Sequence, residues 1–320
     1  MMKLQDVKKI AIVGGGSMGH GCAMVFASAG YPVGMYSRKL ETLQNGLEAM
    51  RADLTFLAER GLGRLEDVES TMARVSTTQD LAEAAADADC VLECVAEDMG
   101  LKQDTFAKLD QMCHPDAILA TNTSVMSPTE IASKSTKRDR IIGTHWWNPP
   151  FLIPLVEVVQ TDVTPDWVID VTMELHRAIG KRPVHCKKDV PGFIANRLQH
   201  ALWREALSIV ERGIADAKTV DESLKYGPGL RLPVLAPCEN ADMVGLDLTL
   251  SIHNYVLKYL EDSHEPSPLL KEKVEKGELG FKTGGVGYQT WTPEEQKALR
   301  ARLLGYLTKA VREMNEAEGK

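Results

Sequence analysis

A histidine and a glutamate, His145 and Glu157, are the side chains in this sequence best suited to proton transfer as a pair. His145 ends the apolar run IIGTH, and Glu157 lies within LVEVV, twelve residues further along and beyond an Asn-Pro-Pro turn. Two strands joined by such a turn can bring the side chains together. A carboxylate beside an imidazole orients it and stabilises its protonated form, so the histidine can take up a hydroxyl proton. The spacing alone also allows a purely structural pair.

A glycine-rich loop near the start of the chain predicts a binding site for a dinucleotide. The run GGGSMG follows the apolar segment KIAIV, precedes a helix-like segment and fits the pattern G-x-G-x-x-G. In that pattern Gly14 permits a tight turn, Gly16 lets the backbone approach a pyrophosphate, and Gly19 lets helix and strand pack closely. The start of the helix would offer free N–H groups to the phosphates. The expected contacts are Gly14, Gly16, Ser17, Met18 and Gly19. A turn without a ligand is the alternative.

The residues after the next strand-like run, YPVGMY, bear on the choice of dinucleotide. NAD-binding domains of this kind place Asp or Glu about 20 residues beyond the last glycine, where it binds the ribose 2′-hydroxyl. Ser37 occupies that place here, and Arg38 and Lys39 follow it. A serine does not repel a 2′-phosphate, and Arg38 can bind that phosphate with charge-assisted hydrogen bonds. The sequence therefore favours NADP as cofactor and also allows NAD. In the alternative, Ser-Arg-Lys is a solvated turn of an NAD enzyme.

The elements that must position these residues alternate between strands and helices in the first part of the chain. Short apolar runs predict buried parallel strands, and segments of helical character separate most of them. The expected strands cover residues 9–13, 31–36, 88–95, 117–121, 141–144, 155–159 and 183–186. The expected helices lie within residues 17–29, 40–72, 102–112 and 167–179. The pattern predicts an α/β fold, with a Rossmann-type dinucleotide-binding domain over residues 1–189.

The pattern changes at the sequence DVPG, residues 189–192, and strand-like runs are absent beyond it. Amphipathic helices are expected there over residues 193–211, 219–226, 242–260 and 293–316. They predict an all-helical domain over residues 190–320, with the active site in the cleft between the domains at the carboxyl ends of the strands. Several of these helices have no further partner within the chain, so we expect a homodimer.

The composition limits the class of protein. The 320 residues are 44% hydrophobic and 26% charged, which is typical of a globular protein. The formal net charge of −8 argues against nucleic acid or an anionic membrane as the main partner. No apolar run approaches the ~18–20 residues of a membrane span, and the N-terminus offers no secretory segment. The six cysteines form no C-x-x-C pair and no zinc pattern, so we expect a cytoplasmic protein without a metal.

Further motifs occur in one order along the chain. They are Asn122–Thr123–Ser124, HWWNPPFLIPLVEV from His145 to Val158, DVPGFIANRL from Asp189 to Leu198, ERG from Glu211 to Gly213, and VGLD from Val244 to Asp247. Together with the glycine loop they resemble the 3-hydroxyacyl-CoA dehydrogenase superfamily, over nearly the whole chain as far as about Tyr288. The resemblance implies an oxidoreductase that transfers a hydride between NADP(H) or NAD(H) and the 3-hydroxyl (3-oxo) carbon of a substrate.

The resemblance also implies a role for each matching residue. His145 takes the place of the catalytic general base, and Glu157 takes the place of its partner. Ser124 and Asn196 take the places of the polar groups that hold the substrate oxygen near the nicotinamide. The positions that line the cofactor cleft are Glu97, Lys102 and Asn122.

Departures from the family pattern bear on the substrate. Trp146 and Trp147 follow His145 where the acyl-CoA enzymes have smaller aromatics, and residues 40–64 contain few lysines to receive CoA phosphates. HWWNPP and GPGLRL are more similar to relatives acting on small free acids. These include L-gulonate 3-dehydrogenase of the lambda-crystallin group, L-carnitine dehydrogenase and the pyridine-carboxylate dehydrogenase of vitamin B6 degradation. We therefore expect a small anionic substrate bound by Trp147 and by Arg231, whose guanidinium can clamp a carboxylate. A surface arginine is the alternative.

Three other functions stay open at this point. A 3-hydroxyacyl-CoA dehydrogenase acting on CoA thioesters would share these motifs. An enzyme that reduces imines or acts on β-amino acids would use the same cleft. A structural, crystallin-like protein would keep the dinucleotide site without turnover, although the intact set Ser124, His145, Glu157 and Asn196 argues against it.

Overall fold

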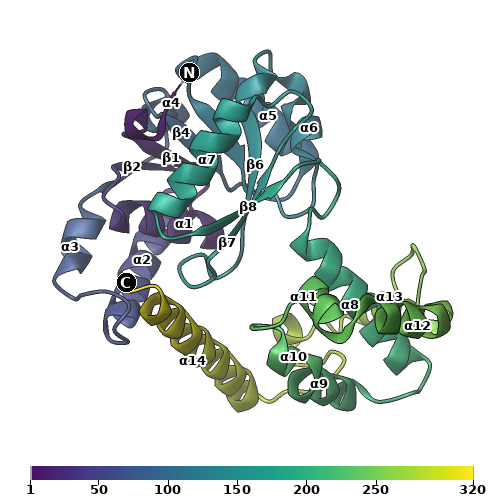
Figure 1. Cartoon of the computed structure of the whole chain (residues 1–320). Helices are drawn as coiled ribbons and strands as arrows, with labels where there is room; N and C mark the ends of the chain where they lie inside the picture. Colours follow the sequence, from purple (N-terminus) through teal and green to yellow (C-terminus); the bar gives the residue numbers. More distant parts are fainter. Residues whose placement is uncertain (1, 320) are drawn as a thin grey trace. The chain divides into compact units, whose positions relative to one another are not determined.

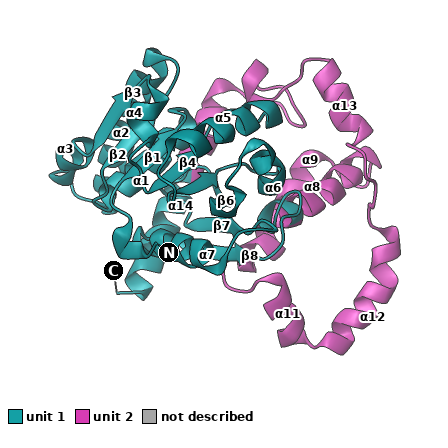
Figure 2. Cartoon of the chain, turned by 90° about the horizontal axis from the view of Figure 1, so that it is seen from above, with its two compact units in different colours: residues 1–197, 304–320 teal, residues 198–303 magenta. Residues whose placement is uncertain are grey.

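The computed structural model describes residues 2–319 and divides the chain into two compact units (Figures 1 and 2). Unit 1 comprises residues 1–197 and 304–320, and unit 2 comprises residues 198–303. Two helices cross this division: α8 (Ala195–Glu211) begins in unit 1, and α14 (Pro293–Ala317) begins in unit 2 and ends in unit 1. The functional boundary predicted between residues 189 and 190 stays a prediction.

Unit 1 contains an eight-stranded sheet in the order β3-β2-β1-β4-β5-β6-β7-β8. The strands are β1 (Ile10–Val13), β2 (Val33–Tyr36), β3 (Val75–Thr78), β4 (Cys90–Glu93), β5 (Ile118–Thr121), β6 (Ile141–Trp146), β7 (Leu155–Val159) and β8 (Arg182–Cys186). The first six strands are parallel, whereas β7 runs antiparallel to β6 and parallel to β8. The order 3-2-1-4-5-6 is that of a doubly wound sheet, and it confirms the predicted Rossmann-type fold.

The core of unit 1 lies on both faces of this sheet, because successive strand residues point to opposite faces. The covering helices are α1 (Ser17–Ser28), α2 (Leu40–Ala58), α3 (Asp67–Met72), α4 (Leu81–Ala85), α5 (Met99–Met112), α6 (Pro128–Ile131) and α7 (Asp166–Ala178). Ile10 and Ile12 of β1 join one apolar cluster, which includes residues of α1 and α7. Ala11 and Val13 join the other, which includes residues of α5 and α6. Strands buried on both faces leave their carboxyl ends as the place where polar groups can meet a ligand.

Two local features differ from the sequence prediction. The strand β3 was not expected, because its residues VSTT are polar and only half-buried at the edge of the sheet. The single helix expected over residues 242–260 is wrong, because the chain breaks at Gly245, where φ is 100°. This left-handed backbone ends α11 (Pro237–Val244) and starts α12 (Leu246–Val256).

Unit 2 is built from helices. Besides α11, α12 and parts of α8 and α14, it contains α9 (Ala217–Tyr226), α10 (Pro228–Arg231) and α13 (Pro268–Glu275). Its described residues form no β-strand and make only two isolated β-bridges, within residues 280–290. This confirms the predicted all-helical second domain. Within residues 2–319, no helix combines the length and the apolar character needed to cross a membrane.

Candidate active site

His145 and Glu157 lie opposite each other on β6 and β7, the strands at which the sheet turns antiparallel. His145 Nδ1 lies 2.8 Å from Glu157 Oε2, and the two side chains are 5% and 0% exposed. Burial strengthens this hydrogen bond, because little water competes for either partner. Nδ1 donates this hydrogen bond to the carboxylate when it carries the proton of the neutral imidazole. Nε2 is then the nitrogen that can accept a proton from a substrate hydroxyl.

The second oxygen of Glu157 is held by the start of α8. Oε1 accepts hydrogen bonds from the backbone N–H groups of Ile194 and Ala195, each at 2.9 Å. Burial raises the pKa of Glu157, but the hydrogen bonds from His145 and from these two amides outweigh it and bring the pKa below its ordinary value. Glu157 is therefore an ionised carboxylate beside the imidazole.

A strained turn presents those two amides to Glu157. Gly192 and Phe193 have consecutive positive φ values of 77° and 49°. Phe193 is 1% exposed and packs against Val159 and Cys186, and its ring centroid lies 5.9 Å from that of His145. A bulky residue in the left-handed region costs about 1–3 kcal/mol and clusters at functional sites. This turn was not predicted, because a phenylalanine gives no sequence signal for positive φ.

The two tryptophans after His145 have different surroundings. Trp146 is 2% exposed and packs into the core, with ring centroids 5.6 Å from Phe26 and 5.3 Å from His176. Trp147 is half-buried, and its ring centroid lies 5.2 Å from that of His145. Trp147 therefore lies beside the imidazole, whereas Trp146 packs into the core. The substrate role of Trp147 stays a prediction.

Ser124 and Asn196 are joined by a hydrogen bond. Ser124 follows β5, and its carbonyl accepts a bond of 2.9 Å from Asn196 Nδ2 at the start of α8. In the same segment Asn122 Oδ1 accepts a bond of 2.8 Å from the Trp146 backbone N–H. Because β5 and β6 are parallel neighbours, this bond fixes the two strand ends to each other, and Ser124 lies at the same edge of the sheet as His145.

A buried ion-pair network lies behind Ser124. Glu97 Oε1 accepts the Ser124 N–H at 2.8 Å, and Glu97 Oε2 lies 3.2 Å from Lys102 Nζ. Lys102 is 1% exposed and also binds both carboxylate oxygens of Glu93, at 2.8 and 3.0 Å. Burial lowers the pKa of Lys102, but the carboxylates of Glu93 and Glu97 raise it above its ordinary value. Lys102 has almost no surface for a ligand, and it contacts Glu97, whose side chain is 37% exposed. The roles of both residues at the cofactor stay predictions. The sequence prediction missed Glu93.

The glycine loop has the shape that a pyrophosphate requires. Gly14 has φ of 119°, and a Cβ there would lie 2.5 Å from the Cys94 carbonyl oxygen. A Cβ at Gly19 would collide with the Gly14 carbonyl oxygen. In contrast, no atom lies within 4 Å of a Cβ built at Gly16, so the backbone there is open to a ligand. Ser17 and Met18 begin α1 after Gly16, and their N–H groups belong to the unpaired first turn of the helix. These residues fit a dinucleotide.

The end of β2 lies beside this loop. The Ser37 Cβ is 3.6 Å from a Cβ built at Gly15, and the Ser37 N–H donates to the Thr78 carbonyl at 3.3 Å. Arg38 is exposed, and its carbonyl accepts a bond of 2.8 Å from Gln79 Nε2. Ser37 therefore lies where a ribose hydroxyl is recognised in this fold, and the exposed Arg38 follows it.

Arg231 is the remaining predicted site residue. It ends α10 in unit 2 and is exposed, and its carbonyl accepts the N–H groups of Val234 and Leu235. Its role with a substrate stays a prediction.

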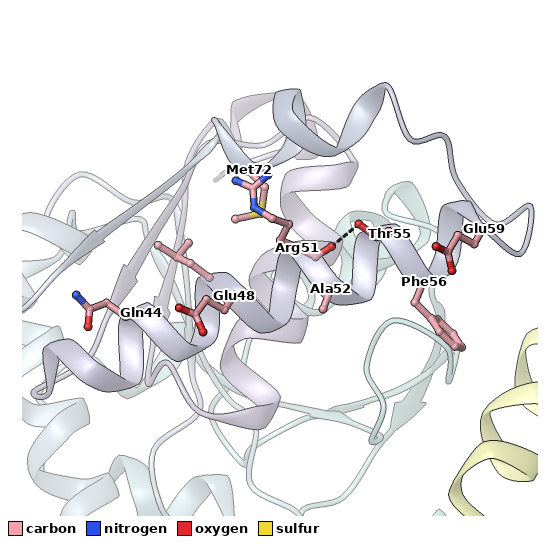
Figure 3. Close-up of a pocket in the computed structure, with 9 residues that line it drawn as sticks. Gln44, Glu48, Arg51, Ala52, Thr55, Phe56, Glu59 and Met72 are labelled. Atoms are coloured by element: carbon pink, nitrogen blue, oxygen red, sulfur yellow. Dashed lines mark hydrogen bonds between the residues drawn. The ribbon is translucent and has the colours of Figure 1, made fainter. Parts of the chain in front are cut away.

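A groove of about 850 Å³ lies along α2 (Figure 3). Its lining residues are Gln44, Leu47, Glu48, Arg51, Ala52, Thr55, Phe56, Glu59 and Met72. None of the predicted site residues is among them, so this groove is separate from the proposed chemistry.

The doubly wound sheet, the open glycine loop and the imidazole–carboxylate pair at one edge together define a nicotinamide-dependent dehydrogenase. Comparison with known families agrees with that class. The domain described as "3-hydroxyacyl-CoA dehydrogenase, NAD binding domain" matches residues 9–190, and the domain described as "3-hydroxyacyl-CoA dehydrogenase, C-terminal domain" matches residues 192–290. This chain belongs to the 3-hydroxyacyl-CoA dehydrogenase family, whose enzymes are oxidoreductases acting on a CH–OH group.

Similar proteins of known name include both small-acid and acyl-CoA enzymes. The 5-formyl-3-hydroxy-2-methylpyridine 4-carboxylate 5-dehydrogenase of Mesorhizobium japonicum is 33% identical over 295 residues, which are 92% of this chain and 94% of the relative. A probable 3-hydroxybutyryl-CoA dehydrogenase of Bacillus subtilis is 38% identical over 280 residues, which are 87% of this chain and 96% of the relative.

A solved structure of a 5-formyl-3-hydroxy-2-methylpyridine 4-carboxylic acid 5-dehydrogenase, described as an NAD+-dependent dismutase, also matches. It superposes with a TM-score of 0.88 at 34% identity and covers 97% of this chain and 99% of its own. The structure of (S)-3-hydroxybutyryl-CoA dehydrogenase from Ralstonia eutropha superposes with a TM-score of 0.75 at 30% identity. The match covers 89% of this chain and 99% of that structure's chain.

Proposed function

We propose that this protein oxidises the 3-hydroxyl group of a small carboxylate-bearing substrate, or reduces the 3-oxo group, with His145 as the acid/base and Glu157 as its partner. The observation that carries the proposal is the buried contact of 2.8 Å between His145 Nδ1 and Glu157 Oε2. It assigns the proton on the imidazole to Nδ1, so Nε2 is ready to take the proton of a substrate hydroxyl. The developing imidazolium is stabilised by a carboxylate that two backbone amides hold in place.

Residues of neighbouring elements place the substrate in this proposal. The Ser124 hydroxyl and the Asn196 amide hold the substrate oxygen, and the hydrogen bond between Asn196 and the Ser124 carbonyl fixes their spacing. Gly14, Gly16, Ser17, Met18 and Gly19 hold the pyrophosphate, and Glu97 and Asn122 line the cleft beside it. The bound nicotinamide supplies the hydride acceptor or donor. Burial of His145 and its neighbouring rings keeps bulk water from competing for Nε2.

Replacing His145 by glutamine tests the assignment. Turnover should fall by ~10²–10⁴-fold, the range for loss of a general base, while dinucleotide affinity stays the same. The matched control is His185→Gln, which changes a part-buried histidine of the same sheet that bonds Gln160. Near-normal turnover in His145→Gln, or an equal loss in both variants, would refute the role.

The small-acid substrate is supported by the relative named for a pyridine carboxylate and by a solved structure of an enzyme of that name, which covers 97% of this chain. Trp147 beside His145 supports a compact substrate, because the indole occupies space next to the reacting group. Arg231 is proposed to bind the carboxylate. Arg231→Ala should then raise the Michaelis constant of the best acid without a matching loss of kcat. The acyl-CoA names of other relatives make CoA-thioester oxidation the competing function.

The cofactor is a nicotinamide dinucleotide, and the family domain and the NAD+-dependent structural neighbour support NAD. A preference for NADP over NAD stays a prediction. It depends on Ser37, which carries no negative charge, and on the exposed Arg38 beside it.

We also propose that the protein works as a homodimer through unit 2. The apolar core clusters consist of residues of unit 1, and the buried residues described in unit 2 are Ser208 and Gly285. The helix α12 leaves Leu246, Leu250 and Tyr255 more than 60% exposed. An apolar surface of this kind marks an association site, and a second copy of the chain is the proposed occupant. A monomeric mass by light scattering at assay concentration would overturn this.

A further inference from the structure

Glu93 is a buried acidic residue that has no role in the proposed reaction as described above. It is the last residue of β4, its side chain is 0% exposed, and it lies at the edge of the sheet where the site residues gather. A carboxylate inside an apolar sheet is costly unless donors satisfy it. Glu93 has such donors in the Val95 N–H at 2.6 Å, the Thr121 hydroxyl at 2.7 Å and the Lys102 ammonium.

One route of hydrogen bonds leads from Glu93 through charged groups to Ser124. Lys102 Nζ contacts Glu93 on one side and Glu97 Oε2, at 3.2 Å, on the other. Glu97 Oε1 then accepts both the Thr123 hydroxyl and the Ser124 N–H. The ammonium thus holds Glu97 in the position from which it binds this segment.

A second route is shorter and uses no ion pair. Thr121 donates its hydroxyl proton to Glu93 Oε2, and the same hydroxyl oxygen accepts the Thr123 N–H at 3.2 Å. Donation to the carboxylate orients the hydroxyl so that its lone pairs face Thr123. Both routes therefore start at Glu93: the first ends at Thr123 and Ser124, and the second ends at Thr123, the residue before Ser124. Asn196 holds the Ser124 carbonyl from α8.

We propose that Glu93 is a positioning residue for the reaction: its carboxylate fixes the Ser124 hydroxyl through Lys102 and Glu97 and through Thr121. The inference rests on the proposed role of Ser124 in holding the substrate oxygen. Two routes that end on the backbone segment Thr123–Ser124 favour this over a role confined to packing, because packing alone does not require both sets of hydrogen bonds to reach that segment.

The test is a double-variant cycle with Glu93→Gln and Ser124→Ala. Glutamine keeps the shape of the side chain but removes the charge that Lys102 and Thr121 bind. Glu93→Gln should lower kcat by roughly 10- to 100-fold, the effect of misplacing a group by about 1 Å, with little change in dinucleotide affinity. In the Ser124→Ala background, where no hydroxyl remains to be positioned, the same change should cost only a few-fold in kcat.

The matched control is Asp110→Asn, which breaks another buried ion pair of unit 1, between Asp110 and Arg140 at 2.9 Å. It should lower thermal stability without a comparable loss of kcat. If Glu93→Gln does not fold, Thr121→Val carries the test, because it removes one route and leaves the ion pair intact; its smaller loss of kcat should also vanish in the Ser124→Ala background.

The positioning role would be overturned if Glu93→Gln lowered kcat by the same factor in the wild type and in the Ser124→Ala background. It would also be overturned if Glu93→Gln and Asp110→Asn lowered kcat equally. Unchanged turnover in Ser124→Ala and in His145→Gln would instead overturn the proposed function itself, so the two failures are distinguishable.

Discussion

Replacing Glu157 by glutamine gives a sharp prediction, because the surrounding donors decide how the new amide must lie. Ile194 and Ala195 both present N–H groups to this side chain at 2.9 Å, so the oxygen of the introduced amide has to face them. The NH₂ group of the amide then points toward His145 Nδ1. Nδ1 can accept that hydrogen bond only when it carries no proton, so the proton of the neutral imidazole moves to Nε2, the nitrogen that should act as base.

Two effects therefore add in Glu157→Gln. A hydrogen bond to a charged group contributes about 1.5–3 kcal/mol, and each 1.36 kcal/mol is a factor of ten in rate, so loss of the charge alone lowers kcat roughly 10- to 150-fold. The wrong tautomer brings the total toward the upper part of the ~10²–10⁴-fold range for loss of a general base.

The assay measures kcat for wild type and Glu157→Gln, with dinucleotide affinity and thermal unfolding measured in parallel. Asp110→Asn is the control, since it neutralises a buried carboxylate far from β7 in sequence and paired with Arg140. It should change unfolding and leave kcat close to the wild-type value. A Glu157→Gln enzyme with normal turnover, or an equal loss of kcat in Asp110→Asn, would refute the reasoning about the pair.

Three further predictions concern the cofactor and the dependence of stability on pH. The ratio of kcat/KM for NADP to kcat/KM for NAD should exceed one in the wild type. It should fall ~10–100-fold in the double variant Ser37→Asp, Arg38→Gln, because one or two charge-assisted hydrogen bonds to the 2′-phosphate are lost. A wild-type preference for NAD would contradict this prediction. Burial lowers the pKa of His176 to about 4 from 6.5, so the unfolded chain takes up the proton first. The free energy of unfolding should therefore drop by about 3 kcal/mol as the pH falls from 6.5 to 4, and His176→Gln should lack this drop in urea titrations. Burial also lowers the pKa of Lys181 to about 8 from 10.5, so the folded chain loses this proton at a lower pH than the unfolded chain. The free energy of unfolding of the wild type should therefore rise by about 3 kcal/mol between pH 8 and 10.5, relative to that of Lys181→Met. A difference between wild type and Lys181→Met that does not change with pH would show that the ammonium is not buried as described.

The sequence patterns that depend on local chemistry were good predictors of the fold. KIAIV followed by GGGSMG predicted both a buried strand and a loop that must approach a ligand, because few other patterns combine an apolar run with glycines at those spacings. His145 and Glu157 were predicted as a pair from alternation and a turn, and β6 and β7 place them in register.

The features that were not predicted depend on contacts distant in sequence. Glu93 was expected only as part of an apolar strand, because nothing local indicates that Lys102 and Thr121 will satisfy its carboxylate. The left-handed Phe193 packs against Val159 of β7 and Cys186 of β8, and the chain segment around Phe193 gives no sign of these contacts.

The return of α14 to unit 1 was likewise invisible in the sequence. Arg312 donates to the Arg60 carbonyl, and Glu318 forms an ion pair with Arg182. A charged amphipathic helix carries no local mark of such partners, so the sequence predicted only an amphipathic helix of the second domain over residues 293–316.

In the proposed function, this member of the family acts on a small free acid rather than on a CoA thioester. The most direct measurement compares kcat/KM for a panel of small 3-hydroxy acids, among them carnitine-like and ring-bearing carboxylates, with that for 3-hydroxyacyl-CoA thioesters. NAD and NADP are both supplied, and the nicotinamide absorbance is followed. We predict the highest kcat/KM for a free acid, together with loss of that activity in His145→Gln. A higher kcat/KM for a CoA thioester would contradict the account of the substrate.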